Sequence, residues 1–204
     1  MILSLISLDL SSPSVRQSLK NCEDMHRSLM KAFDRNRNEA KVLYRIIRSE
    51  KNVQIYVQSN DIPNWARIDE KGYHCVKMKD ISKLLSSFRD QQILHFSLLG
   101  VPSKKVVGEG KNSKRIVLRG EEQQLEWLNR QAEKYGFCIK EAHITAKAEL
   151  IAGEKKSGQF HLVAIPFEGV LQIVDSQVFA ESLQDGIGPE KAYGCGMMMI
   201  GRVR

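Results

Sequence analysis

The stretch around which the fold is organised reads Gly186-Ile187-Gly188-Pro189-Glu190-Lys191-Ala192-Tyr193-Gly194-Cys195-Gly196 and runs into the apolar segment Met197 to Ile200. Five of the chain's 14 glycines fall between residues 186 and 201. Such density between a helical pattern and a short strand indicates a backbone that turns sharply or approaches another group closely. One interpretation is a phosphate cradle, in which N–H groups around Gly186, Gly188, Gly194 and Gly196 bind an anion together with Lys191. The other is a turn that lets a last strand enter a sheet.

The segments that precede this loop predict alternating strands and helices. A helix over Glu121 to Tyr135 carries apolar residues at helical spacing, and Gly136 ends it. The remaining predicted elements of this half are strands over Leu94 to Val101, Phe137 to Ile151, Phe160 to Pro166 and Phe167 to Val174, a helix over Ser176 to Leu183, and the last strand after the glycines.

The first half of the chain predicts the same order. Its predicted elements are a strand over Met1 to Leu10, a helix with the buried stripe Cys22, Met25, Leu29, Ala32 and Phe33, a hairpin of Val42 to Ile47 and Val53 to Val57, a strand over Tyr73 to Met78, and a helix or connector over Ile81 to Phe88. The segment 65–73 has no clear pattern. Both halves resemble a β-α-β-β-α-β unit with helices on one face of an antiparallel sheet.

The predicted fold class is therefore α+β, with two tandem ferredoxin-like (RRM-like) βαββαβ domains. We place the N-terminal domain at residues 1–90, which includes the helix around residue 26. The C-terminal domain, residues 91–204, holds the glycine-rich loop and two basic segments. Because the same sheet serves enzymes, metal carriers and RNA-binding proteins, the fold alone does not decide the function.

Composition narrows the class of protein. The chain has 204 residues, of which 42% are hydrophobic and 27% charged, enough to form a substantial core. Its apolar runs are shorter than a membrane span and no signal peptide is recognised, so we expect a cytoplasmic protein without a membrane partner. The four cysteines lie more than fifty residues apart, outside any zinc or disulfide spacing, and are expected to be buried free thiols.

The charge of the chain predicts a polyanionic partner. The formal net charge is +7 and the pI is about 9.2, which favours nucleic acid. The predicted sheets lack the aromatic pattern that stacks single-stranded bases, so RNA is expected to be held as a structured stem. The candidate RNA-binding residues are the basic segment Lys104, Lys105, Lys111, Lys114 and Arg115, and the hairpin-tip lysines Lys155 and Lys156. Solvated loops are the alternative for both segments.

His26 is the candidate for acid–base chemistry. At 100° per residue it lies about 60° from Leu29, at the edge of the buried stripe of its helix. Glu23 precedes it by three positions, so the two side chains can meet on one helix surface, where the carboxylate would favour the imidazolium form. A structural histidine at the boundary of the core is the alternative interpretation.

Three segments together resemble the CasE family, the CRISPR RNA-processing endoribonucleases of type I-E systems. They are the glycine-rich stretch, Phe167-Glu168-Gly169-Val170-Leu171, and Glu23-Asp24-Met25-His26-Arg27-Ser28-Leu29-Met30-Lys31-Ala32-Phe33. The resemblance spans nearly the whole chain and is weakest in the middle. It implies a tandem ferredoxin-like fold, binding of the repeat hairpin in precursor CRISPR RNA, and metal-independent cleavage at the 3′ base of that hairpin. The family histidine falls on His26, whereas the family's tyrosine three residues earlier is Glu23 here.

The sequence thus predicts an RNA endonuclease in which a 2′-hydroxyl attacks the adjacent phosphorus, with neither metal nor cofactor. His26 is the predicted acid, and Glu23 either takes the tyrosine's part as a base or orients His26. Arg27 and Lys31 are predicted to stabilise the phosphate. By the same resemblance, the protein stays on its product and joins the other subunits of the surveillance complex. The rival hypothesis is a non-catalytic hairpin-binding subunit, and an enzyme for a phosphorylated small molecule is disfavoured because the loop lacks a P-loop or dinucleotide pattern.

Overall fold

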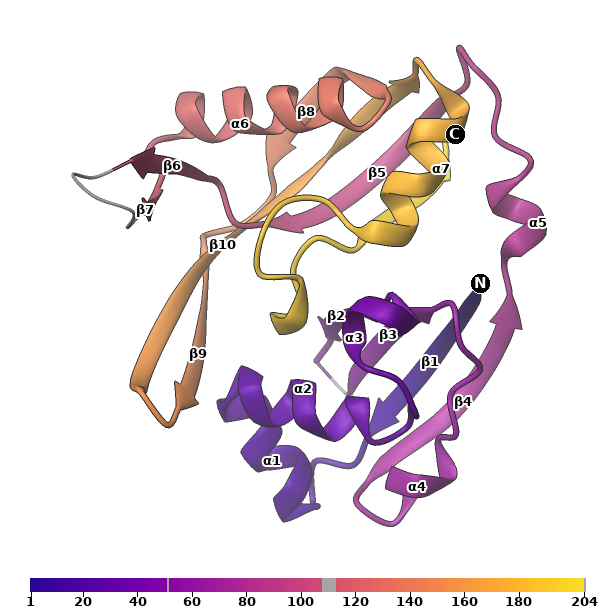
Figure 1. Cartoon of the computed structure of the whole chain (residues 1–204), viewed down its shortest axis with the longest axis vertical. Coiled ribbons are helices and arrows are strands. Elements are labelled where there is room, and N and C mark those ends of the chain that lie inside the picture. The colour runs from indigo at the N-terminus through magenta and orange to yellow at the C-terminus, as the bar shows by residue number, and fades with distance from the viewer. Residues whose placement is uncertain (51, 108–112, 204) are drawn as a thin grey trace.

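The computed structural model describes residues 1–50, 52–107 and 113–203, with only the backbone described for Val107, Ser113 and Lys114. Lys111, a predicted RNA contact, lies outside the described residues. Within these ranges no helix is long and apolar enough to cross a bilayer. Each half of the chain builds an antiparallel sheet, and the two sheets lie one above the other in Figure 1.

The first sheet has the strand order β2-β3-β1-β4, with every neighbouring pair antiparallel. This is the order of a ferredoxin-like unit. The elements of this half are β1 (Ile2–Leu8), α1 (Pro13–Lys20), α2 (Cys22–Met30), α3 (Arg37–Ala40), β2 (Leu43–Arg48), β3 (Val53–Ser59), α4 (Ala66–Asp69), β4 (Tyr73–Asp80) and the connecting α5 (Ser82–Leu85). The short α4 occupies the segment that had no clear sequence pattern.

The second sheet repeats this order as β11-β5-β10-β8. Two additions project from it: β9, which pairs only with β10, and the two-stranded ribbon β6-β7. The elements are β5 (Ile93–Gly100), β6 (Ser103–Val107), β7 (Ser113–Val117), α6 (Glu121–Lys134), β8 (Phe137–Ile144), β9 (Glu149–Lys155), β10 (Gly158–Ile173), α7 (Ser176–Asp185), the 3₁₀ turn η1 (Lys191–Tyr193) and β11 (Met198–Arg202). The predicted α+β class with two ferredoxin-like units is confirmed, while the boundary between residues 90 and 91 stays a prediction.

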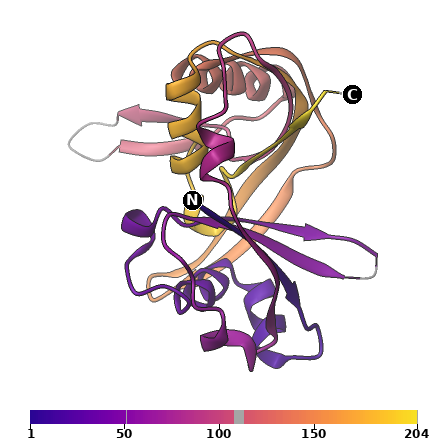
Figure 2. The ribbon, with the colours of Figure 1, turned by 90° about the vertical axis from the view of Figure 1, so that its right-hand side faces the viewer.

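Two element predictions were wrong. The strands predicted over Phe160 to Pro166 and Phe167 to Val174 form one continuous strand, β10, because Pro166 lies where the pairing of β10 changes from β9 to β8. The single strand predicted over Phe137 to Ile151 is divided between β8 and β9. The resulting β9–β10 hairpin extends beyond the second sheet toward the helices of the first (Figure 2).

The helix predicted around the stripe Cys22 to Phe33 is α2, which ends at Met30, so Ala32 and Phe33 lie beyond it; a separate helix, α1, precedes it. Pro13 begins α1, with Ser12 as its N-cap, and Asn21 ends α1 and caps α2 by accepting a hydrogen bond from the Glu23 N–H. Met25 and Leu29 on α2 are buried in the core of the first sheet. This packing fixes the rotation of α2, so the other side of the helix faces the second half of the chain.

The two halves also meet through direct contacts. Gln58 of β3 donates a hydrogen bond to the Leu183 carbonyl at 2.6 Å, and Lys41 forms an ion pair with Asp185 at 2.7 Å. The hairpin reaches α2, where Asn21 Oδ1 accepts a hydrogen bond from the Glu154 N–H at 3.2 Å. The hairpin and the glycine-rich loop therefore lie against the first half on the side where α2 faces them.

Candidate functional site

The glycine-rich loop leaves α7 and crosses toward the first sheet before it returns as β11 (Figure 1). Its two ends are held together, because the Ile187 N–H donates to the Gly196 carbonyl at 2.8 Å. The Gly196 N–H in turn donates to the Leu99 carbonyl at 2.8 Å, which anchors the loop on β5. The loop is thus a closed, backbone-bonded turn whose tip is η1.

Close packing explains the glycines at the base of this tip. Gly194 has φ of +83°, and a Cβ atom added there would lie 3.0 Å from the ring of the buried Tyr44. A Cβ at Gly196 would lie 2.7 Å from the Ile187 carbonyl oxygen. These contacts favour the structural interpretation of the glycines, since several loop N–H groups already donate to protein carbonyls. The RNA-binding role of Gly186, Gly188, Gly194, Gly196 and Lys191 stays a prediction.

His26 lies half-buried on α2, on the side that faces the tip of the loop. Burial lowers the pKa of His26 below its usual value, and the charge of Glu23 only partly opposes this effect. Arg37 and Lys155 lower the same pKa further. Glu23 thus favours the imidazolium form, as expected, but in the free protein desolvation and the two cations outweigh it.

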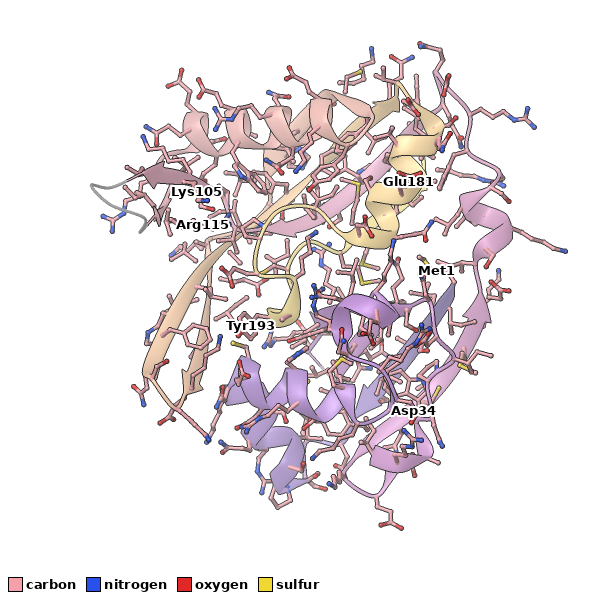
Figure 3. The ribbon with its side chains drawn as sticks, in the orientation of Figure 1. Met1, Asp34, Lys105, Arg115, Glu181 and Tyr193 are labelled. Carbon is pink, nitrogen blue, oxygen red and sulfur yellow. The ribbon has the colours of Figure 1, made fainter. Side chains whose placement is uncertain are left out.

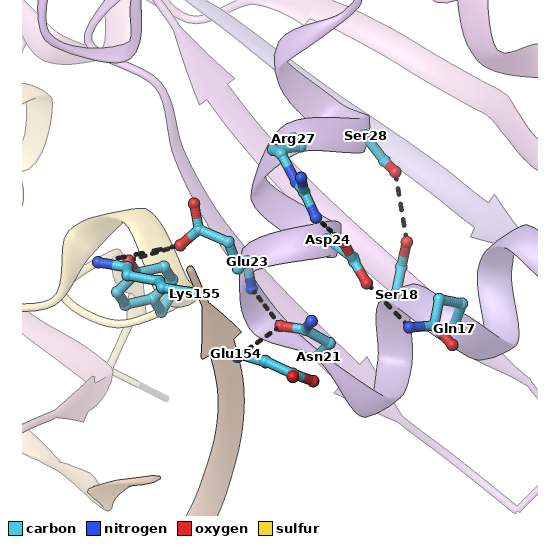
Figure 4. A network of polar contacts seen from close by, with 10 residues as sticks. Gln17, Ser18, Asn21, Glu23, Asp24, Arg27, Ser28, Glu154 and Lys155 are labelled. Carbon is cyan, nitrogen blue, oxygen red and sulfur yellow. Dashed lines mark hydrogen bonds and ion pairs between the residues drawn. The ribbon is translucent and has the colours of Figure 1, made fainter. Parts of the chain in front are cut away.

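Glu23 makes its closest contact with a residue that the sequence did not single out. Tyr193 Oη donates a hydrogen bond to Glu23 Oε2 at 2.8 Å, and the Tyr193 and His26 ring centroids are 6.5 Å apart. Lys155 Nζ lies 4.0 Å from the same carboxylate oxygen (Figure 4). Three segments that are distant in sequence, namely α2, the hairpin and the loop tip, thus meet at one carboxylate.

The two hairpin lysines have different surroundings. Lys155 Nζ lies 5.3 Å from the centroids of both the Phe160 and the Tyr193 rings, so its charge is directed toward the site. Lys156 is exposed in the turn. An open cleft of about 730 Å³ lies between α1, α2 and the hairpin tip; it is lined by Gln17, Asn21, Glu23, Asp24, Arg27, Glu154, Lys155, Lys156 and Ser157.

The predicted phosphate-stabilising cations of α2 are both exposed. Arg27 forms an ion pair with Asp24, and Lys31 is an exposed residue at the C-terminal cap of α2. The pKa of Lys31 is lowered, chiefly by the neighbouring charge of Lys71. Arg37 on α3 was not predicted, yet its charge acts on His26 and burial lowers its own pKa. The stabilising role of Arg27 and Lys31 stays a prediction.

The basic residues of the β6-β7 ribbon form a separate surface. Figure 3 shows Lys105 and Arg115 on the ribbon at the side of the second sheet, away from Tyr193. Lys105 pairs directly with Arg115 across the ribbon, and Lys104 is also exposed. Like charges opposite each other are destabilising unless an anion or solvent screens them. This ribbon therefore fits a phosphate contact at a distance from His26.

The cysteines and possible metal ligands give no second site. Within the described ranges no three His, Cys, Asp or Glu residues are grouped to hold a metal ion. Burial raises the pKa of Cys22 to about 11 and of Cys195 to about 12, which keeps both thiols protonated. Cys75 is exposed and Cys138 half-buried, so the expectation of four buried thiols holds for two.

Comparison with known proteins gives consistent matches, most of which cover nearly the whole chain. A family profile described as CRISPR associated protein matches residues 1–202. The CRISPR-associated endoribonuclease Cse3 of Thermus thermophilus is 29% identical over 215 residues, covering 98% of this chain and 99% of that protein. The CRISPR system Cascade subunit CasE of Escherichia coli is 33% identical over 116 residues, covering 52% of this chain and 57% of that protein. The solved structure of CRISPR endoribonuclease Cse3 bound to 19 nt RNA superimposes with a TM-score of 0.87 at 27% identity, covering 98% of this chain and 100% of that one.

Proposed function

The chain belongs to the CRISPR associated protein family, which confirms its resemblance to CasE, and on this premise we propose that it is an endoribonuclease of precursor CRISPR RNA. It binds the repeat stem-loop and cuts at the 3′ base of the stem. Two relatives support this: one is named an endoribonuclease, and a Cse3 structure is bound to RNA. The observation that carries the proposal is the meeting of His26, Glu23, Lys155 and Tyr193 where the two halves of the chain join.

The reaction uses the RNA as its own nucleophile. The 2′-hydroxyl upstream of the scissile bond attacks phosphorus, so that an O2′–P bond forms and the P–O5′ bond breaks. The proton of the 2′-hydroxyl leaves to a base, and His26 gives a proton to the departing 5′-oxygen. The products are a 2′,3′-cyclic phosphate and a 5′-hydroxyl. The nucleophile, the leaving group and both transferred protons come from RNA and protein, so the balance of this reaction requires no metal ion.

Charge around His26 suits this chemistry. The phosphorane carries extra negative charge, and Arg37 and Lys155 are the cations whose fields reach His26. The same cations lower the pKa of His26 in the free protein. A bound phosphate offsets their charge, which raises the pKa of His26 and favours the imidazolium needed for proton donation. Substrate binding thereby prepares the acid.

The RNA stem is held mainly through its phosphates. The cleft beside α2 lies between the helix and the exposed Lys156, and Glu23 is part of its lining. Lys104, Lys105 and Arg115 on the ribbon extend the contact along the stem, and the loop residues Gly188 and Lys191 approach it from the joint between the halves. After cleavage the protein keeps the hairpin and acts as a subunit of the surveillance complex, as the name of the Cascade relative suggests.

One experiment tests the proposal and its rival. Labelled repeat RNA is incubated with excess protein, with and without EDTA, beside a substrate carrying deoxyribose upstream of the cleavage point. We expect equal cleavage in EDTA, no cleavage of the deoxy substrate, and normal binding of both. Loss of activity that Mg²⁺ restores, or cleavage of the deoxy substrate, would contradict the mechanism. Binding without cleavage of the all-ribose RNA would identify a non-catalytic hairpin-binding subunit.

A further inference from the structure

The two carboxylate oxygens of Glu23 have different surroundings. Oε2 accepts the Tyr193 hydrogen bond and faces Lys155 Nζ at 4.0 Å. Oε1 accepts no hydrogen bond from the described residues. The Glu23 side chain is 23% exposed, so this second oxygen can be reached by a ligand. One oxygen is thus held by the protein and the other is available.

Tyr193 is itself held in place from several sides. Its backbone lies at the end of η1, between Glu190 and Gly194, which both have left-handed conformations. Its ring packs at 5.4 Å from the Phe160 ring and edge-on to His26. Because the backbone and ring are fixed independently of Glu23, the phenol can determine where the carboxylate points, rather than follow it.

We propose that Tyr193 is a positioning residue for RNA cleavage: its hydroxyl holds Glu23 Oε2, so that Oε1 accepts the proton of the attacking 2′-hydroxyl. The inference rests on the proposed function and deepens it, because it assigns the base. The proton passes from O2′ to Glu23 Oε1 as the O2′–P bond forms, while His26 protonates O5′ as the P–O5′ bond breaks. Solvent then removes the proton from Glu23 and returns one to His26.

Holding one oxygen has a definite effect on the rate. A glutamate side chain on a helix samples several rotamers, and a base acts only when its oxygen lies within hydrogen-bond reach of the nucleophile. The Tyr193 hydrogen bond selects one rotamer before the RNA arrives. Lys155 adds attraction to the same oxygen, but at 4.0 Å and with 48% of its side chain exposed it directs the carboxylate less sharply.

The test compares Tyr193→Phe, which removes only the hydroxyl, with Glu23→Gln and the double variant. The free energy of a hydrogen bond to a charged group determines the expected effect. Tyr193→Phe should therefore slow single-turnover cleavage at saturating RNA by about 10- to 100-fold. The dissociation constant for the hairpin should stay unchanged. In the Glu23→Gln background the second change should have no further effect, since the carboxylate it positions is gone. Tyr135→Phe is the matched control and should cut at the wild-type rate.

A second measurement reports the contact without relying on activity. Burial and the hydrogen bond to Glu23 both raise the pKa of the Tyr193 phenol, and so does the charge of Glu23. NMR titration of a labelled Tyr193 ring should therefore give a lower pKa in Glu23→Gln than in the wild type. An unchanged phenol pKa would overturn the contact on which the inference stands.

The remaining outcomes also decide the inference. Cleavage by Tyr193→Phe at the wild-type rate would overturn the inference. So would a Tyr193→Phe change that slows cleavage as much in the Glu23→Gln background as in the wild-type background. Weaker hairpin binding in Tyr193→Phe would make the phenol an RNA contact instead. If the wild-type protein itself fails to cut repeat RNA, the proposed function fails and takes the assigned base with it, while the phenol titration still reports whether Tyr193 holds Glu23.

Discussion

Replacing Gly196 by alanine should destabilise the protein through the backbone of the glycine-rich loop. Gly196 has φ of +81°, where an L-residue costs roughly 1–2 kcal/mol. Its Cβ would lie 2.7 Å from the Ile187 carbonyl oxygen, and a backbone atom cannot rotate away as a side chain can. Relief requires the loop ends to separate, at the expense of the hydrogen bond from Ile187 to Gly196, worth about 1 kcal/mol.

The sum is about 2–3 kcal/mol, which corresponds to a fall of about 4–12 °C in melting temperature for a chain of this size. The control is Gly201→Ala, because a Cβ there meets nothing within 4 Å and its φ is not positive. Thermal unfolding of both variants and of the wild type measures the difference. If Gly196→Ala has the same melting temperature as Gly201→Ala, the packing argument is refuted. If it then also binds the hairpin more weakly, Gly196 contacts the RNA phosphate instead.

Three further predictions concern the reaction. His26→Ala should slow single-turnover cleavage by about 10²- to 10⁴-fold with unchanged hairpin binding, and the exposed His95→Ala should not; slow cutting caused by lost binding would make His26 a binding residue. The cleavage rate should fall as pH rises through the pKa of His26. Because Glu23 raises that pKa, Glu23→Gln should move this decline in rate to lower pH. If the decline stays at the same pH, another group is the acid. Changing Lys155 and Lys156 together to alanine should lower the log-log salt slope of binding by about one unit for each lost phosphate contact, and an unchanged slope would mean that both face solvent.

The sequence was sufficient for the fold wherever a pattern is local. Strand alternation, helical stripes and the stop at Gly136 place most elements, and the repeated order in the two halves predicts two similar sheets. The prediction failed at Pro166, where a proline suggests the end of a strand, but the strand continues and only changes its pairing partner. Tertiary contacts decide which strands pair with each other, so no short stretch of sequence contains this information.

The candidate site was predictable only in part for the same reason. His26 and Glu23 share one helix surface, and helical geometry places them together without any knowledge of the rest. Tyr193 lies 170 residues from Glu23 in the sequence, and no spacing rule relates them. The effect of Glu23 on the pKa of His26 has the expected direction, but the larger effect of burial could not be predicted, because burial between two halves of a chain cannot be read from one helix.

If Tyr193 positions Glu23 as proposed, the glycine-rich loop has a role in catalysis that needs no contact with RNA. Gly194 follows Tyr193 directly, and its missing Cβ lets the loop approach the ring of Tyr44 on β2. A side chain at 194 would push the tip away from the first sheet, and with it the phenol from Glu23, which α2 fixes in place. The loop thus joins the two halves and sets the distance between a hydroxyl on one and a carboxylate on the other. On the mechanism proposed above, a substitution there should slow cleavage while the RNA contacts remain, because the phenol then no longer holds the Glu23 carboxylate in place.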